Sequence, residues 1–218
     1  VVRVRAAALN FHDVLTAMGL LSDQSVEGGA GQHALGGEFA GVDGGHRVFG
    51  LAVSSMSSRV VTAAMLRGRV PRGMVFTEAA GLPVVYLTVY WSVSEVADMQ
   101  PGEWALVHAA AGGVGLAAAN VIGGIVGGRM IATAGSEEKR AYLSMVCGVE
   151  GVFNSRDLGF SEGVMRVTHG RGVDVVVNSL AGAAIAESVR CLAPFGRFIE
   201  LGKTAIYSDA RLHLRPFG

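Results

Sequence analysis

An uncharged stretch that changes abruptly into glycines constrains the fold of this chain more than any other feature. Residues Trp104–Gly115 have the sequence WALVHAAAGGVG. The apolar run is typical of a buried strand, and the glycines after it predict a tight turn and the start of a helix. Such a turn directs backbone N–H groups toward one point, where they can bind a pyrophosphate. The turn departs from the strict G-x-G-x-x-G pattern at Ala109, and close packing of helix on strand is an alternative reason for its glycines.

The residues after the second predicted strand indicate which dinucleotide would bind. In NAD-binding folds, a carboxylate about 20 residues past the glycines binds the ribose 2′-OH. Here the strand that ends at Ala134 is followed by Gly135, and then by Ser136, Lys139 and Arg140. A small residue, a hydroxyl and two cations suit a 2′-phosphate, so the sequence predicts an NADPH site. The alternative is that the two cations belong to a solvated helix face beside two glutamates.

Composition and charge exclude several classes of protein. Half of the 218 residues are hydrophobic and 17% are charged, so the chain can form a sizeable core and is not expected to be disordered. The formal net charge is zero and no basic block occurs, which argues against nucleic-acid binding. Cys147 and Cys191 lack metal-ligand spacing, and we expect two buried thiols in a reducing cytoplasm.

The uncharged segment from Ala105 to Gly128 is long enough to cross a bilayer. Its many glycines, together with His108 and Asn120, favour the strand–turn–helix interpretation instead. We expect no signal peptide, because charged and polar residues interrupt the apolar residues near the N-terminus.

The first part of the chain is predicted to be rich in β-structure. Residues 1–70 contain short apolar runs separated by Gly, Ser and Asp, which is typical of strands and turns. We expect a short helix at Phe11–Gly19 and a mobile loop at residues 23–37. A further helix is expected to start with Thr77 as its N-cap and to continue past Pro83 as far as Val93.

From Glu103 onward, predicted strands alternate with predicted helices. This alternation, with apolar strands such as VDVVVN, predicts an α/β fold with a doubly wound parallel sheet. The first helix is expected to end near Ile122, because Gly123 and Gly124 would each cost roughly 1 kcal/mol in a helix. A sixth strand would be expected after the five predicted ones, and the chain stops before it. We therefore expect a fragment cut at both ends. The predicted strands are Trp104–Ala109, Arg129–Ala134, Gly151–Asn154, Val173–Asn178 and Arg197–Leu201, with helices at 113–122, 136–146, 159–169 and 182–192.

Six motifs occur together and in order: Leu9–Asp13 (LNFHD), Gly36–Gly41 (GGEFAG), Ala79–Thr88 (AAGLPVVYLT), the AAAGGVG turn, Asn178–Ala181 (NSLA) and Leu201–Thr204 (LGKT). With them, essentially the whole chain resembles the enoyl reductase domain of a polyketide synthase or animal-type fatty acid synthase. Those domains belong to the zinc-free branch of the medium-chain dehydrogenase/reductase superfamily. The NSLA and LGKT motifs are more specific than the glycine turn.

The resemblance implies an architecture and an activity. A partial GroES-like, β-rich substrate domain at residues 1–88 would pack on a partial Rossmann, NADPH-binding domain at residues 89–218. The reaction would reduce a 2-enoyl thioester on an acyl carrier protein, with hydride added to Cβ and a proton to Cα. Partners would be the carrier-bound substrate and neighbouring megasynthase domains, with neither nucleic acid nor a membrane.

The resemblance also implies site residues. Lys203, just past a strand end, would be the catalytic proton donor, and the Asp that assists it in the family lies beyond Gly218. A solvent-facing lysine is the alternative. Arg156 would reach the adenosine phosphate, or would form a surface pair with Asp157. Asn178 would line the nicotinamide ribose with its neighbours, or would simply cap the next helix. The full set of predicted cofactor contacts is Asn10, Thr88, Ala111, Gly112, Gly113, Val114, Gly115, Ser136, Lys139, Arg156, Asn178, Ser179, Leu180 and Gly202.

Several residues depart from related sequences. Zinc-dependent relatives carry a Cys and a His where this chain has Asn10 and Gly37, so no metal site is expected. His12 stands where the family usually has Arg, and a role away from the chemistry is favoured for it. Tyr86, with Thr88, would contact the carboxamide or pack in the core. Leu21 stands where some polyketide reductases carry a Tyr linked to product configuration.

Two other functions remain open from the sequence. One is a free-standing, zinc-free quinone or enone reductase with the same fold. The other is a degenerate reductase domain that keeps a structural role without turnover.

Overall fold

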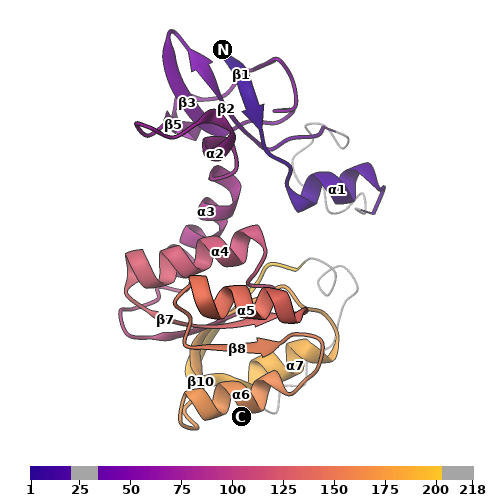
Figure 1. Cartoon of the computed structure of the whole chain (residues 1–218), viewed down its shortest axis with the longest axis vertical. Helices are drawn as coiled ribbons and strands as arrows, with labels where there is room; N and C mark the ends of the chain where they lie inside the picture. The colour runs from indigo at the N-terminus through magenta and orange to yellow at the C-terminus, as the bar shows by residue number, and fades with distance from the viewer. Residues whose placement is uncertain (21–33, 203–218) are drawn as a thin grey trace. The chain divides into compact units, whose positions relative to one another are not determined.

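The computed structural model describes residues 1–20 and 34–202, which belong to two compact units divided between Leu87 and Thr88. Figure 1 traces both units along the chain. Leu21, Lys203 and most of the expected loop at 23–37 lie outside the described residues.

The first unit contains an antiparallel sheet with strand order β4-β1-β2-β3-β5. Side chains alternate between its two faces. Phe39 packs with Val2, Val48 and Val60 on one face, whereas its neighbour Ala40 packs against α2 on the other. This arrangement explains why the first four residues of the central strand β2 are buried without alternation. The strands are β1 (Val2–Ala7), β2 (Glu38–Asp43), β3 (His46–Leu51), β4 (Arg59–Val60) and β5 (Arg67–Arg69).

The helices of the first unit confirm one expectation and correct another. Helix α1 (Phe11–Ala17) lies where a short helix was predicted. The helix predicted from Thr77 is instead two elements, α2 (Phe76–Ala80) and α3 (Pro83–Tyr90), which are separated at Gly81 and Leu82. The break suits Pro83, because proline has no N–H to continue a helical ladder. A short 3₁₀ segment, η2 (Ala64–Leu66), precedes β5.

The predicted N-cap at Thr77 is wrong. Val75 occupies the N-cap position, and its N–H donates to Glu78 Oε2 at 3.0 Å. The Glu78 carboxylate in the first helical turn therefore accepts from the N–H of the N-cap residue, as the glutamate of a capping box does.

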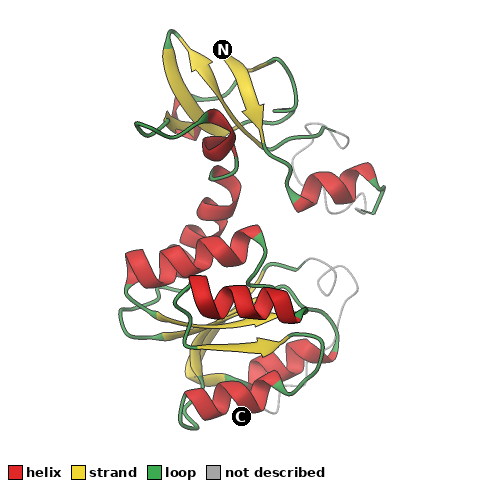
Figure 2. Ribbon diagram, in the orientation of Figure 1, coloured by secondary structure: helices red, strands yellow, loops and turns green. Residues whose placement is uncertain are grey.

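The second unit contains the predicted parallel sheet, with strand order β10-β9-β6-β7-β8. Figure 2 shows helices above and below its strands, as in a doubly wound fold. The buried core includes Leu106, Ile131, Phe160 and Val176. The strands are β6 (Trp104–Val107), β7 (Arg129–Ala134), β8 (Gly151–Asn154), β9 (Val173–Asn178) and β10 (Leu192–Glu200). The helices are α4 (Gly113–Ala119), α5 (Glu137–Val146), α6 (Phe160–Val167) and α7 (Ala183–Arg190).

The helix after the glycine turn is longer than expected. It continues from α4 as a π-helical segment, η4 (Asn120–Val126), so the predicted end near Ile122 is wrong. Gly123 and Gly124 are exposed, while Val121 and Ile122 are buried. Burial of those two side chains offsets the low helix propensity of the glycines. The helix ends at Gly127, whose left-handed φ of 75° suits a glycine.

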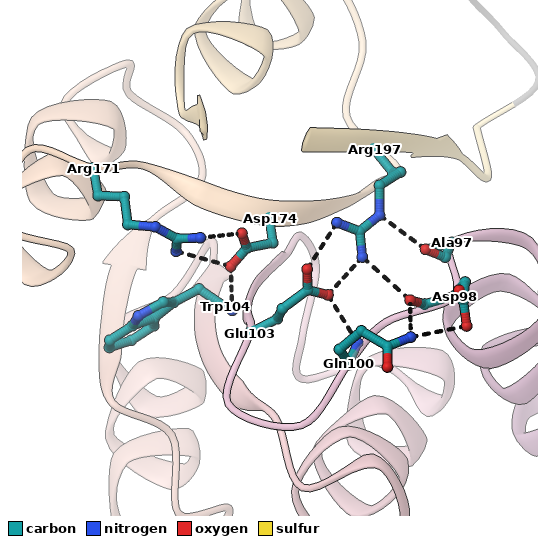
Figure 3. A network of polar contacts seen from close by, with 8 residues as sticks. All are labelled: Ala97, Asp98, Gln100, Glu103, Trp104, Arg171, Asp174 and Arg197. Atoms are coloured by element: carbon teal, nitrogen blue, oxygen red, sulfur yellow. Dashed lines mark hydrogen bonds and ion pairs between the residues drawn. The ribbon is translucent and has the colours of Figure 1, made fainter. Parts of the chain in front are cut away.

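A polar network lies at the amino ends of the parallel strands (Figure 3). Asp174 accepts hydrogen bonds from the backbone N–H of Trp104 at 2.8 Å and from the guanidinium of Arg171. Arg197 forms an ion pair with Glu103 and donates from Nε to the carbonyl of Ala97 at 2.8 Å. The network connects β9 and β10 to the segment that follows the π-helical η3 (Trp91–Val96).

Two further expectations concern the cysteines and the membrane. Both cysteines are free thiols; the prediction of a buried thiol is confirmed for Cys191, which is fully buried, whereas Cys147 is only partly buried. Burial raises the pKa of the Cys191 thiol to about 12. Within residues 1–20 and 34–202, no helix has the length and apolar character needed to cross a membrane.

Candidate functional site

The glycine turn lies at the carboxyl end of β6, where ligands of doubly wound sheets bind. Ala109 adopts a left-handed φ of 49°, which ends the strand earlier than predicted. The N–H of Ala110 donates to the carbonyl of Thr133 in β7 at 2.9 Å, and Gly112 is the N-cap of α4. The turn is therefore fixed to two strands, and the helix begins directly after it. The structure brings the predicted residues Ala111–Gly115 together at this point.

The glycines of this turn have different roles. A Cβ on Gly115 would lie 2.2 Å from Ala110 Cα, so this glycine permits α4 to pack against the turn. A Cβ on Gly112 would meet only the carbonyl of Ala109, at 3.3 Å. Gly112 and Gly113 are exposed, which leaves the first turn of the helix accessible. Helix packing thus explains Gly115, whereas exposure of Gly112 and Gly113 is compatible with phosphate binding.

The end of β7 brings two basic side chains to a glycine. A Cβ on Gly135 would lie 2.8 Å from Arg156 Nε, so the Arg156 side chain lies directly over this position. Ser136 is the N-cap of α5, and its Oγ accepts from the N–H of Lys139 at 3.4 Å. Arg140 Nη1 donates to the carbonyl of Ala134 at 3.3 Å, which holds its guanidinium near the strand end. Two guanidiniums, those of Arg156 and Arg140, therefore lie near Gly135, the position at which NAD-binding folds usually carry an acid.

The acidic side chains nearby have other hydrogen bonds. Hydrogen bonds from its own N–H and from the Ser136 hydroxyl lower the pKa of the exposed Glu138 carboxyl. Asp157 accepts from Asn154 Nδ2 at 2.6 Å and from the N–H of Gly159 at 3.0 Å. In the part of the chain that the structure describes, Arg156 forms no ion pair with Asp157. Its guanidinium is exposed at the strand edge.

The NSLA segment begins at the last residue of β9, Asn178, which is fully buried. Asn178 Oδ1 accepts from the N–H of Leu180 at 3.2 Å, and Nδ2 donates to the carbonyl of Leu180 at 2.9 Å. Asn178 thus shapes its own turn, whereas Gly182 is the N-cap of α7. Ser179 is exposed beside it. The sequence analysis missed Glu200, which contacts both Asn178 and Gly202; a carboxylate at the last position of a strand was the available signal.

His108 is a second residue that the sequence analysis did not place in a site. It is 4% exposed at the end of β6, with Nδ1 2.8 Å from Thr133 Oγ1 and Nε2 2.8 Å from Ser188 Oγ. The Ser188 hydroxyl donates to the carbonyl of Ala184 at 2.6 Å, so we assign the ring proton to Nε2. Burial lowers the pKa of His108 to about 4. The neutral imidazole therefore connects β7 and α7 beneath the glycine turn.

The candidate residues of the first unit have defined structural contacts. Asn10 caps α1, with Oδ1 accepting from the N–H of His12 at 3.0 Å. The buried Asp13 accepts from the N–H groups of Asn10 and Gly36, both at 2.8 Å. His12 is exposed.

Glu38 was also missed by the sequence analysis. It is 2% exposed and accepts from the N–H of Val84 at 2.8 Å. Burial raises the pKa of its carboxyl, and this outweighs the opposing effect of the hydrogen bond. Its contact places a buried acceptor at the first turn of α3, where the helix has free N–H groups.

Helix α3 carries the two remaining candidates. Tyr86 lines an apolar pocket of about 620 Å³ in the first unit, together with Phe49, Met74 and Leu82. Thr88 is half-buried at the start of the second unit. Among residues 1–20 and 34–202, no group of three His, Cys, Asp or Glu side chains could hold a metal ion.

Comparison with known proteins gives consistent matches. The sequence model described as "Zinc-binding dehydrogenase" matches residues 113–217. A phenolphthiocerol/phthiocerol polyketide synthase of Mycobacterium tuberculosis is 45% identical over 98% of this chain and 10% of its own length. The chain therefore spans about a tenth of the length of the curated relatives it matches.

Solved structures match over longer shares of their length. The CurK enoyl reductase is 41% identical, with a TM-score of 0.85, over 93% of this chain and 65% of its own. The nucleotide-binding subdomain of the enoylreductase domain of PpsC from Mycobacterium tuberculosis is 50% identical, with a TM-score of 0.58, over 62% of this chain and 74% of its own. Quinone oxidoreductases are similar at 26–30% identity.

Proposed function

Because this chain belongs to the enoyl reductase domains of polyketide synthases, in the medium-chain dehydrogenase/reductase superfamily, we propose that it reduces the 2,3 double bond of a 2-enoyl thioester. The combination of a parallel Rossmann sheet with an antiparallel, β-rich unit is that of the superfamily. The bound nicotinamide would supply the hydride that adds to Cβ.

The cofactor that we propose is NADPH. The observation that carries this choice is the position of Arg156 over Gly135, with Lys139 in the adjoining first turn of α5. A carboxylate at position 135 would repel a 2′-phosphate and bind a free ribose hydroxyl. Glycine leaves space there, and the guanidinium offers a planar set of donors that matches phosphate oxygens.

The remaining cofactor contacts follow from the strand ends. The exposed N–H groups of the first turn of α4 would bind the pyrophosphate, because a helix N-terminus carries free donors and a partial positive charge. Ser179, Leu180 and Gly202 lie at the carboxyl ends of β9 and β10 and would line the nicotinamide ribose. Asn10 and Thr88 remain proposed contacts at the nicotinamide.

The chemistry also requires a proton and a group that stabilises negative charge. Addition of hydride to Cβ places negative charge on the thioester oxygen, and Cα then takes a proton. We propose Lys203 as the proton donor, because it closely follows β10 in the sequence. The residue itself lies outside the described part of the structure. No metal is proposed, so hydrogen bonds and this ammonium would replace a Lewis acid.

The substrate is proposed to be bound to an acyl carrier protein, with neighbouring synthase domains as further partners. This follows from the multidomain polyketide synthases to which the chain is similar. The free-standing quinone or enone reductase is less well supported, because the quinone oxidoreductases are 26–30% identical whereas enoyl reductases of polyketide synthases reach 41–50%.

The direct test combines cofactor binding with turnover. We expect the protein to bind NADPH more tightly than NADH and to oxidise NADPH when a crotonyl thioester is added, as followed at 340 nm. Lys203→Ala should remove turnover while NADPH binding persists. Binding of NADPH without reduction of any enoyl thioester would instead support the degenerate, structural alternative.

A further inference from the structure

A single carboxylate joins the two turns at the carboxyl ends of β9 and β10. Glu200 Oε2 accepts from Asn178 Nδ2 at 2.7 Å, and Glu200 Oε1 accepts from the N–H of Gly202 at 2.6 Å. Glu200 and Asn178 are direct neighbours in the parallel register of the two strands. Both oxygens of one side chain are therefore used to hold two segments that are 22 residues apart in the sequence.

The Asn178 side chain transmits this contact to the NSLA turn. It is fully buried and uses both amide atoms on Leu180, as donor to the carbonyl and as acceptor from the N–H. The N–H of Leu201 adds a bond to the Asn178 carbonyl at 2.8 Å. A change in the Glu200 carboxylate therefore reaches Ser179 and Leu180 through a buried amide whose orientation is fixed.

Gly202 is shaped to receive the same carboxylate. A Cβ at this position would lie 2.8 Å from Glu200 Oε1 and 3.6 Å from the Ser179 carbonyl oxygen. The turn after β10 thus comes close to both Glu200 and the NSLA turn. A side chain here would displace the Glu200 carboxylate, whereas the Ser179 carbonyl lies at an ordinary contact distance.

We propose that Glu200 is a positioning residue, which holds Ser179, Leu180 and Gly202 in the arrangement that receives the nicotinamide half of the cofactor. This inference rests on the proposed function, because it concerns the same cofactor. Glu200 itself does not act on the substrate. Both of its oxygens accept hydrogen bonds from the two turns, so Glu200 acts by holding the backbone of those turns in place.

The chemistry of the contact demands a carboxylate. Both partners of Glu200 are donors, so both of its oxygens must accept. In Glu200→Gln one oxygen becomes an NH₂ group, which places two donors against each other. Rotation of the Asn178 amide does not relieve this, because its Nδ2 would then face the N–H of Leu180. The substitution is nearly isosteric, so it changes hydrogen bonding with little change in packing.

The test separates the two halves of the cofactor. Binding of NADPH and of 2′,5′-ADP is measured by calorimetry for the wild-type protein, for Glu200→Gln and for Glu150→Gln, a control in an exposed ion pair with Arg129. We expect Glu200→Gln to weaken NADPH binding at least tenfold and to leave binding of 2′,5′-ADP, which lacks the nicotinamide, unchanged. The Gly202 amide proton should move upfield in the NMR spectrum of this variant, because it loses a charged acceptor.

A second variant tests the same contact from the turn after β10. Gly202→Ala should reproduce the selective loss and replaces Glu200→Gln as the test if that variant does not fold.

The outcomes distinguish this inference from the proposed function. A wild-type protein that binds neither probe would contradict both. A wild-type protein that binds both, with a Glu200→Gln variant that binds both equally well or loses both in parallel, would overturn the positioning role alone.

Discussion

Arg197 and Glu103 form a two-point ion pair although 94 residues separate them in the sequence. Arg197 Nη1 lies 3.0 Å from Glu103 Oε1, and Nη2 lies 2.5 Å from Oε2. The third nitrogen, Nε, donates to the Ala97 carbonyl (Figure 3). The hydrogen bond from Arg197 lowers the pKa of the Glu103 carboxyl. One guanidinium thus fixes β10 to the segment that enters the sheet at β6.

This geometry predicts a measurable loss of stability in Arg197→Met. Glu103 would keep its partly buried charge without its partner, so the free energy of unfolding should fall by about 2 kcal/mol. Arg197→Lys should not restore it, since an ammonium cannot make three hydrogen bonds in the same plane. Urea unfolding measures the change. The control is Glu150→Gln, which breaks an exposed pair with Arg129 and should cost less than about 0.5 kcal/mol; equal losses in the two variants would contradict the account.

Substitution by alanine should have opposite effects on stability at two glycines of the continuous helix α4–η4. Gly115→Ala would place a Cβ 2.2 Å from Ala110 Cα and should destabilise the protein by about 2 kcal/mol or more. Gly123→Ala adds a Cβ where no atom lies within 4 Å and should stabilise it by about 0.5–1 kcal/mol through helix propensity. Thermal unfolding compares them directly. A stabilising Gly115→Ala would mean that helix α4 does not approach the turn as described.

His108 predicts a loss of stability in acid. Its pKa is lowered from 6.5 to about 4 in the folded protein, so between these values the unfolded chain binds a proton that the folded chain does not. Stability from this residue is complete above about pH 6.5 and is lost as the pH falls, by on the order of 3 kcal/mol near pH 4. His108→Gln should be less stable at pH 7 but should depend less on pH in this range. Urea unfolding at several pH values tests this, and parallel curves for the two proteins would contradict it.

The position of Arg156 predicts that the protein binds NADPH in preference to NADH. Arg156→Ala should weaken NADPH binding about tenfold, because a charge-assisted hydrogen bond to phosphate is worth roughly 1.5 kcal/mol. Binding of NADH, which lacks the 2′-phosphate, should not change. Lys139→Ala should behave similarly, and the control Arg166→Ala, an exposed arginine on α6, should alter neither affinity. Calorimetry with both dinucleotides checks this; equal losses for NADPH and NADH would remove Arg156 from the phosphate site.

The elements that could be predicted from the sequence are those that depend on local patterns of residues. The strands β7, β8 and β9 have the predicted bounds, because continuous apolar runs between glycines and polar turns leave few alternatives. The helix extension through Gly123 and Gly124 was missed, because its stability comes from buried Val121 and Ile122 and not from helix propensity.

Contacts between segments that are distant in the sequence could not be predicted from sequence patterns either. Glu200 meets Asn178 only because β9 and β10 pair in parallel, and Arg156 lies over Gly135 only because β7 and β8 do. His108 looked like one more residue of an apolar strand, whereas its partners come from β7 and α7. The site residues themselves stay predictions until they are tested with ligand.

The measurement that tests the central claim most directly is isotope transfer from a labelled cofactor. The protein is incubated with NADPH deuterated at the transferring C4 position and with a crotonyl thioester, and the product is analysed by mass spectrometry and NMR. The account predicts a butyryl thioester that carries one deuterium at Cβ, with the solvent proton at Cα. Recovery of unreacted crotonyl thioester from a protein that has bound NADPH would contradict it.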